Sequence, residues 1–201
     1  MMKRSSASWK PPIPEKLFGE HRGFGSGLFV DLVPRSAWFT NLRSCVSKTD
    51  WQRIHDMVVQ RAGNRCEICG SSPDPEQRLW MEAHERWEYD NVLRTQTLRR
   101  LICLCTRCHL ATHFGYAKTQ GRERQAMAHL MGVNRWNAEQ AAAHVNSAFD
   151  LWRKRSSVEW HLDLSMLLGA EVEVREPPDP SERRRQAEDR TRDVRRNGGL
   201  A

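Results

Sequence analysis

The sequence has no long hydrophobic run, and this absence excludes one large class of proteins. No apolar stretch approaches the ~18 residues that a membrane-spanning helix needs, so we expect no membrane partner. Lys3 and Arg4 are not followed by the apolar segment of a secretory signal peptide, so we expect a cytoplasmic protein. No internal repeat is visible either.

A disulfide framework and a redox motif are also disfavoured. Disulfides would need an oxidising compartment, and a thioredoxin-like pair would need a surrounding βαβ pattern that the sequence lacks. Four of the six cysteines instead form two Cys-x-x-Cys knuckles, a pattern typical of a tetrahedral zinc site with four thiolate ligands. The predicted ligands of a structural zinc are Cys66, Cys69, Cys105 and Cys108. The other two cysteines, Cys45 and Cys103, lack knuckle spacing and are expected to be small buried apolar residues.

Positive charge is in excess. The net charge is +7 and the isoelectric point is about 9.4, which favours an anionic partner, most simply nucleic acid. A solvated basic surface without a ligand would give the same composition. The sequence does not indicate an oligomeric state.

Composition divides the chain into five segments. Residues 1–26 are rich in proline and glycine and predict a flexible arm. Residues 27–65 lead into a central module at 66–115, and residues 116–174 predict a helical C-terminal region. Residues 175–201 combine many charges with almost no apolar side chains, which predicts a disordered tail.

Local patterns predict a mixed α+β fold. A helix over Thr49–Ala62 has Thr49 as its cap and Gly63 after its end, and its apolar residues recur every three or four positions. Strands at Arg78–Tyr89 and Thr95–Leu104 are expected to pair as an antiparallel hairpin. The other predicted elements are helices at Thr106–His113, Gly121–Met131 and Asn137–Arg155, and a strand at Val158–Leu164 that can continue over Leu167–Val174.

The order knuckle, hairpin, knuckle, helix resembles the HNH endonucleases, a family with a ββα-metal module. The matching pieces are Cys66-x-x-Cys69, Met81-Glu-Ala-His84-Glu85 and Cys105-x-x-Cys108-His109-x-x-x-His113. They cover about residues 62–115. The resemblance implies an α+β core stapled by zinc, and a metal-dependent endonuclease that hydrolyses phosphodiester bonds, with DNA favoured over RNA.

The resemblance also implies a second, catalytic ion, which would be Mg²⁺, Mn²⁺, Ni²⁺ or Zn²⁺. Its ligands would be His84 on the strand and His109 and His113 on the helix. Two histidines at i and i+4 share one helical face, so they can converge on one ion with a histidine from a facing strand. Residues expected to contact nucleic acid are four arginines around the hairpin: Arg86, Arg99, Arg100 and Arg107.

Two positions depart from the family pattern. The family's general-base histidine directly follows the strand ligand, and here that position is Glu85. A carboxylate with an ordinary pKa near 4.3 is a weak base, so burial would have to raise that pKa. The family's asparagine is replaced by Arg100. In an alternative register His84 is the base and Ala83 takes the ligand position, which loses one ligand.

These departures leave a second function open, a non-catalytic zinc-stabilised module that binds nucleic acid. A third reading is a zinc module that binds protein. The nuclease reading predicts cleavage that depends on metal, the second predicts salt-sensitive binding alone, and the third predicts neither.

Overall fold

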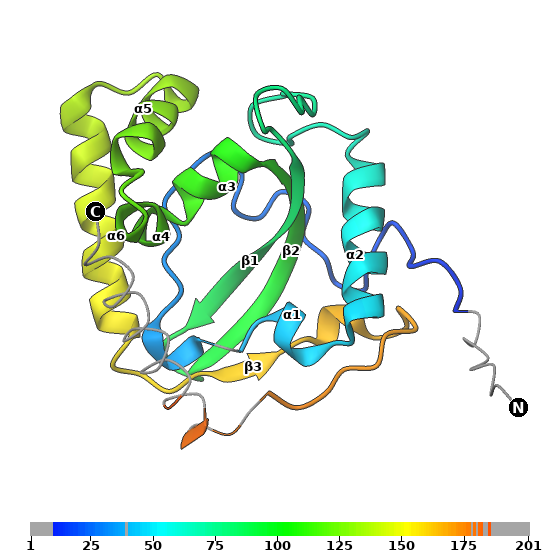
Figure 1. Ribbon diagram of the computed structural model, residues 1–201. Helices are drawn as coiled ribbons and strands as arrows, with labels where there is room; N and C mark the ends of the chain where they lie inside the picture. Colours follow the sequence, from blue (N-terminus) through cyan, green and yellow to red (C-terminus); the bar gives the residue numbers. More distant parts are fainter. Residues whose placement is uncertain (1–9, 39, 178, 180, 183–184, 186–201) are drawn as a thin grey trace, which may run out of the picture.

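The computed structural model describes residues 10–38, 40–177, 179, 181–182 and 185. Most of the predicted charged tail at 175–201 therefore lies outside the described residues. Within them the fold is α+β, as predicted. A three-stranded sheet has helix α2 on one side of its long hairpin and helices α3 to α6 on the other (Figure 1). Among the described residues, no helix combines the length and hydropathy needed to cross a membrane.

The hairpin forms the centre of the molecule. Strand β1 (Met81–Asp90) pairs antiparallel with β2 (Thr95–Cys105), and the short β3 (His161–Asp163) adds to β2 in parallel. Leu101 and Ile102 are both fully buried although consecutive strand residues point to opposite faces, so both faces of β2 are covered. β1 is an edge strand, and the site described below lies along it.

A β-bulge interrupts the hairpin. The register passes from Arg86↔Arg100 to Trp87↔Leu98, which leaves Arg99 as the extra residue in β2. The carbonyl of Arg99 accepts a hydrogen bond of 2.9 Å from the amide of His21. The bulge thereby attaches the N-terminal segment to the sheet.

That attachment corrects the prediction of a flexible arm over residues 1–26. Residues 10–26 form no helix or strand, but Ile13 and Leu17 are buried. Glu20 and Arg61 form a buried ion pair of 2.7 Å. Apolar burial and this pair hold the segment against α2 and β2; residues 1–9 lie outside the described residues.

Helix α2 (Lys48–Arg61) begins slightly earlier than predicted. Ser47 rather than Thr49 is its cap, because the Ser47 hydroxyl accepts the amide of Asp50. Gly63 follows the helix with a φ of +62°, as the sequence predicts for the residue after a helix end. Two short elements precede it, the 3₁₀ turn η1 (Arg35–Ala37) and α1 (Leu42–Cys45).

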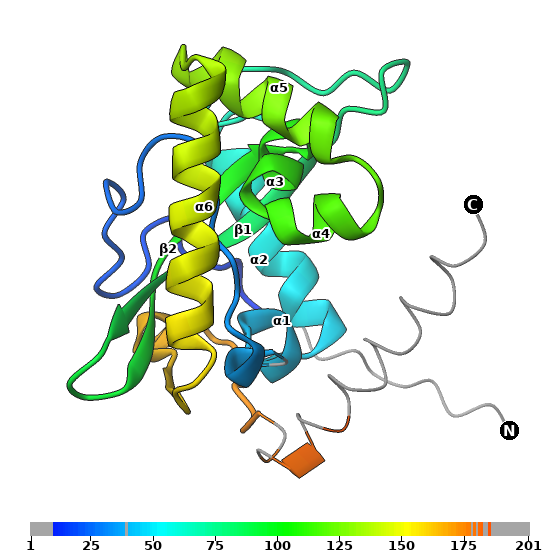
Figure 2. The same ribbon diagram turned by 90° about the vertical axis from the view of Figure 1, so that its left-hand side faces the viewer.

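The C-terminal helices are α3 (Thr106–Thr112), α4 (Phe114–Thr119), α5 (Glu123–Asn134) and α6 (Ala138–Arg155). The sequence missed α4, where Phe114 is fully buried. The helix predicted over Gly121–Met131 extends further, because α5 continues through Gly132 to Asn134 and ends where Arg135 adopts a φ of +55°. At the start of α6, Asn137 and Gln140 form a capping box, in which each side chain accepts the backbone amide of the other residue. Figure 2 shows α6 running alongside α3 to α5.

The last predicted strand is largely replaced. Only residues 161–163 of Val158–Leu164 form a strand, and the 3₁₀ turn η2 (Ser165–Leu167) stops its continuation. Ser165 donates its amide to the Asp163 carboxylate, so the side chain of Asp163 turns the chain away from the sheet.

Candidate functional site

Four cysteine thiols meet where α2, β2 and α3 come together. The sulfurs of Cys66, Cys69, Cys105 and Cys108 all lie within 4.8 Å of one another, and Cys69 and Cys105 are 3.6 Å apart. A tetrahedral zinc with bonds of about 2.3 Å would separate its sulfurs by about 3.8 Å. All four cysteines are free of disulfides. The predicted four-cysteine cluster therefore forms, and its donor set and spacing fit a structural zinc.

The protonation of these thiols also fits a cation. The pKa of Cys66 is lowered because Cys105 and Cys108 hydrogen-bond to its sulfur. The pKa of Cys108 is raised because its thiol is hydrogen-bonded to Cys105 and Cys66 and is buried. Without a metal, the cluster holds only part of the negative charge of four thiolates, because like charges at this spacing repel. A divalent ion would compensate that repulsion.

Backbone hydrogen bonds fix the conformation of both knuckles. Cys105 is also the cap of α3, and its sulfur accepts the Cys108 amide at 3.5 Å. In the first knuckle the Gly70 amide donates to the Cys66 carbonyl at 2.9 Å, and Gly70 adopts a φ of +73°, which favours glycine. The backbone of both turns therefore directs the sulfurs to one point.

His129 of α5 is a neighbour of this cluster that the sequence did not reveal. Its Nε2 lies 3.2 Å from the sulfur of Cys108. Burial and the nearby charge of Arg107 lower the pKa of His129, so the ring is neutral at pH 7 and can donate one N–H to the sulfur. No spacing signal links it to the knuckles, because the contact comes from the packing of α5 on α3.

Three histidines form a second cluster, which brings together the three predicted residues of the β1 strand and the α3 region. One ring nitrogen from each of His84, His109 and His113 lies within 4.8 Å of the others. The ring centroids are 4.6 to 5.2 Å apart. The Nε2 atom of His84 is buried without a hydrogen-bond partner among the described residues. A buried imidazole nitrogen with no partner is a candidate metal ligand.

The histidine cluster is electrostatically suited to a cation. Burial is the main cause that lowers the pKa of His84 well below its ordinary range, and burial lowers the pKa of His113 to about 3. Both rings are therefore neutral at pH 7, which is the form that binds metal. Burial alone would raise the pKa of Glu82, but a hydrogen bond from His109 and the charges of His109 and His55 lower it. Glu82 is thus an anion beside the cluster.

Glu85 lies in the same hollow as the histidines. This hollow of about 330 Å³ opens along the edge strand β1 and is lined by side chains of α2, β1 and α3, including Trp51, His55, Glu82 and the three histidines. Burial raises the pKa of Glu85 to about 7, although the amides of Arg43 and Leu42 donate to its carboxylate. Its Oε1 is shielded and has no partner among the described residues. The burial that a carboxylate base requires is therefore present.

Two of the four arginines predicted to contact nucleic acid are inside the protein, which corrects that prediction. Arg86 is fully buried with its guanidinium 4.0 Å from the ring centroid of Phe29. Arg100 is 7% exposed and pairs with Glu67 at 2.5 Å. Both arginines project from one face of the hairpin. Residues 24–29 cover Arg86, and Glu67 of the first knuckle covers Arg100.

Arg99 and Arg107 remain accessible. Arg99 is 43% exposed at its side chain and pairs with Glu88 at 2.6 Å. Arg107 is exposed and donates to the side-chain Oε1 of Gln77 at 2.6 Å. Contact of these two with nucleic acid stays a prediction.

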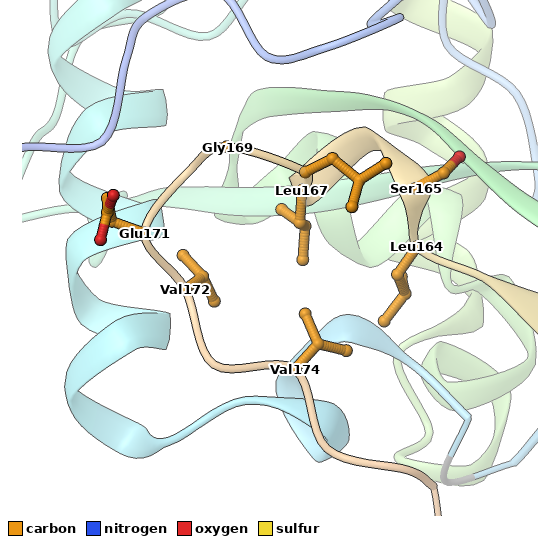
Figure 3. A pocket seen from close by; sticks show the side chains of 8 residues that line it. Leu164, Ser165, Leu167, Gly169, Glu171, Val172 and Val174 are labelled. Atoms are coloured by element: carbon orange, nitrogen blue, oxygen red, sulfur yellow. The ribbon is translucent and has the colours of Figure 1, made fainter.

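A larger hollow of about 520 Å³ lies elsewhere, after β3 (Figure 3). Its walls are mostly Leu and Val side chains such as Leu164, Val172 and Val174, and Glu171 is the one ionisable residue that lines it. It shares no lining residue with the histidine hollow. Its chemistry does not suit catalysis.

No family model matches the chain, and no curated protein or solved structure is detectably similar to it.

Proposed function

We propose that this chain is a metal-dependent endonuclease whose catalytic module is an HNH-like ββα unit formed by β1, β2 and α3. The observation that carries the proposal is the convergence of His84, His109 and His113 with Glu85 in one hollow. The order of elements around the cysteine cluster and the excess of positive charge support it.

The residues have distinct roles in this proposal. His84, His109 and His113 would hold a divalent ion, which would polarise a phosphoryl oxygen. Glu82 orients His109 through a hydrogen bond of 2.9 Å to Nδ1, which leaves Nε2 directed to the ion. Glu85 takes a proton from the attacking water, and its raised pKa suits that task near neutral pH.

The geometry supports one of the two registers that the sequence left open. The ring of His84 packs against both helix-derived histidines, whereas the methyl side chain of Ala83 offers no atom that could bind a metal. His84 is therefore the better ligand and Glu85 the better base.

The alternative is a non-catalytic module that binds nucleic acid through the same fold. The absence of a histidine after His84 favours it, because a carboxylate is the less usual base at that position. The two functions differ in one observable, the breaking of a phosphodiester bond.

Cleavage and metal content together test the proposal. The protein is purified without added metal, its metal content is measured, and labelled DNA and RNA are incubated with it in Mg²⁺, Mn²⁺, Ni²⁺ or Zn²⁺. We expect one tightly held zinc, a second exchangeable ion and metal-dependent cleavage. His109→Ala should abolish cleavage and the second ion while the zinc remains. His161→Ala, on the exposed start of β3, is the matched control. Cleavage retained by His109→Ala would contradict the assignment.

A further inference from the structure

His55 lines the histidine hollow from the side opposite α3, and the roles proposed above do not use it. Helix α2 runs beside the hairpin (Figure 1) and places Trp51 and His55, one helical turn apart, at the edge strand β1. The hollow thus has a metal-ligating wall on β1 and α3, and a further imidazole on α2.

Both ring nitrogens of His55 lie beside hydrogen-bond acceptors. Nδ1 lies 3.1 Å from a carboxylate oxygen of Asp56, and Nε2 lies 3.3 Å from the carbonyl oxygen of Met81. Both partners only accept hydrogen bonds, and only the imidazolium has an N–H on each ring nitrogen. Charged side chains around the ring include Asp56 of its own helix and Glu82 of β1, and Arg43 lines the same hollow over the ring of Trp51.

We infer that His55 is the general acid of the reaction, an inference that rests on the proposed nuclease function. Glu85 removes a proton from water as the water oxygen bonds to phosphorus. The bond between phosphorus and the leaving ribose oxygen breaks, and the electron pair of that bond stays on the oxygen. His55 donates its Nε2 proton to this oxygen, whose approach replaces the long contact to Met81. Proton exchange with solvent then restores both side chains.

The chemistry of the leaving group explains why such an acid helps. A ribose alkoxide is a strong base, so the bond to it breaks slowly unless a proton arrives during cleavage. Glu85 cannot supply this proton, because it accepts one in the same step. An acid on another wall of the hollow meets the requirement, and His55 borders open space there with each ring nitrogen beside a hydrogen-bond acceptor.

Replacing the leaving oxygen of the substrate with sulfur tests the general-acid role of His55. The cleavage products on DNA are mapped first, to identify whether the 3′ or the 5′ oxygen of the deoxyribose leaves. The wild-type protein, His55→Gln and the matched control His161→Gln then cleave that oligonucleotide and its counterpart with sulfur in place of the leaving oxygen, in the same metal. A thiolate leaves without protonation, so the sulfur substrate does not need the acid.

We expect His55→Gln to lose about 100-fold more rate on the oxygen substrate than on the sulfur substrate, while His161→Gln shows no such difference. The comparison is made within each preparation, so a partly unfolded variant lowers both rates equally and leaves their ratio unchanged. Equal loss on both substrates, or no loss on either, would overturn the general-acid role while the nuclease function stands. A wild-type protein that cleaves neither substrate would overturn the nuclease function and the acid with it.

Discussion

The Nδ1 atom of His109 lies 2.9 Å from a carboxylate oxygen of Glu82. The bond orients the ring of His109, whose other nitrogen, Nε2, does not take part in it. Partners of this kind commonly contribute 10- to 100-fold to metal affinity.

Glu82→Ala should therefore weaken binding of Mn²⁺ or Ni²⁺ by about 10- to 100-fold, because the ring of His109 loses its orientation and its anionic partner. Calorimetric titration of the zinc-loaded protein measures the effect. Glu82→Gln is the control, since its amide oxygen can still accept the Nδ1–H and the loss should be smaller. Equal affinity in Glu82→Ala and the wild type would show that Glu82 does not support the site.

The low pKa of His113 predicts that acid destabilises the protein when the histidine site is metal-free. Its pKa is about 3 in the folded state and about 6.5 when unfolded, so the unfolded chain binds the proton and the folded chain does not. The stabilisation is fully present above pH 6.5 and is lost as the pH falls toward 3, by roughly 1 kcal/mol per pH unit.

Urea unfolding of the zinc-loaded protein between pH 7.5 and 5.5 tests this prediction. Acid also protonates the cysteine cluster, so the informative quantity is the difference between wild type and His113→Gln, which lacks the titrating ring. The free energy of unfolding should fall more steeply with acid in the wild type. Identical slopes would mean that His113 takes up a proton in the folded state.

His129 is expected to stabilise the zinc site. An N–H donated at 3.2 Å to the Cys108 sulfur lowers its negative charge and ties α5 to the cluster. His129→Ala should therefore release zinc to a chromogenic chelator about 10-fold faster than the wild type. His129→Gln can keep one N–H donor, so its rate of zinc release should lie between those of the wild type and His129→Ala. A release rate unchanged in both variants would show that the contact does not stabilise the site.

The buried pair of Arg100 and Glu67 predicts a large loss of stability. Removal of Arg100 leaves the largely buried Glu67 carboxylate with only the longer, 3.3 Å contact to the more exposed Arg22, so Arg100→Ala should lower the free energy of unfolding by about 3 kcal/mol, the low end for a broken buried pair. Arg99→Ala is the control, since its exposed pair with Glu88 should contribute about 1 kcal/mol or less. Denaturant unfolding compares the two. If Arg100→Ala instead weakened nucleic-acid binding with no loss of stability, the original prediction of a phosphate contact would be correct.

Local signals were sufficient for the elements that build the site. The periodic apolar face of α2, the alternation in the hairpin and the capping box of α6 each depend on near neighbours in the chain. Both clusters follow from the same local order. Strand β2 ends at Cys105, which caps α3, so His109 lies one helical turn after a cysteine of the first cluster and His113 lies one turn further on. The antiparallel register then places His84 across from Ile102 on the neighbouring strand.

What the sequence could not predict depends on contacts between distant segments. Charge alone does not show what covers a strand, so Arg86 was expected at the surface although residues 24–29 pack over it. His129 and His55 reach the two clusters from α5 and α2, and no spacing rule links either to its neighbours. The predicted helix ended at Met131, just before Gly132, but a glycine inside a helix costs only about 1 kcal/mol, and α5 continues through it.

Glu85 gives the most direct test of the proposed chemistry, because activity and stability should respond to its replacement in opposite ways. Its ionised form is the base, so cleavage should rise with pH through about 7, and Glu85→Gln should lower the rate by about 10²- to 10⁴-fold. Rates measured from pH 5.5 to 8.5 in one metal show this. Glu85→His restores the residue that the resembling family has at this position, and it should keep more activity than Glu85→Gln.

Stability provides the independent check on Glu85. A raised pKa means that the folded state holds the proton more tightly than the unfolded state, so ionisation of Glu85 costs folding energy as the pH rises from about 4.5 to 7. Glu85→Gln removes this cost and should be at least as stable as the wild type above pH 7, which excludes misfolding as the cause of its lost activity. A Glu85→Gln protein that still cleaves at the wild-type rate would show that another group takes the proton, and the carboxylate would then be part of the structure alone.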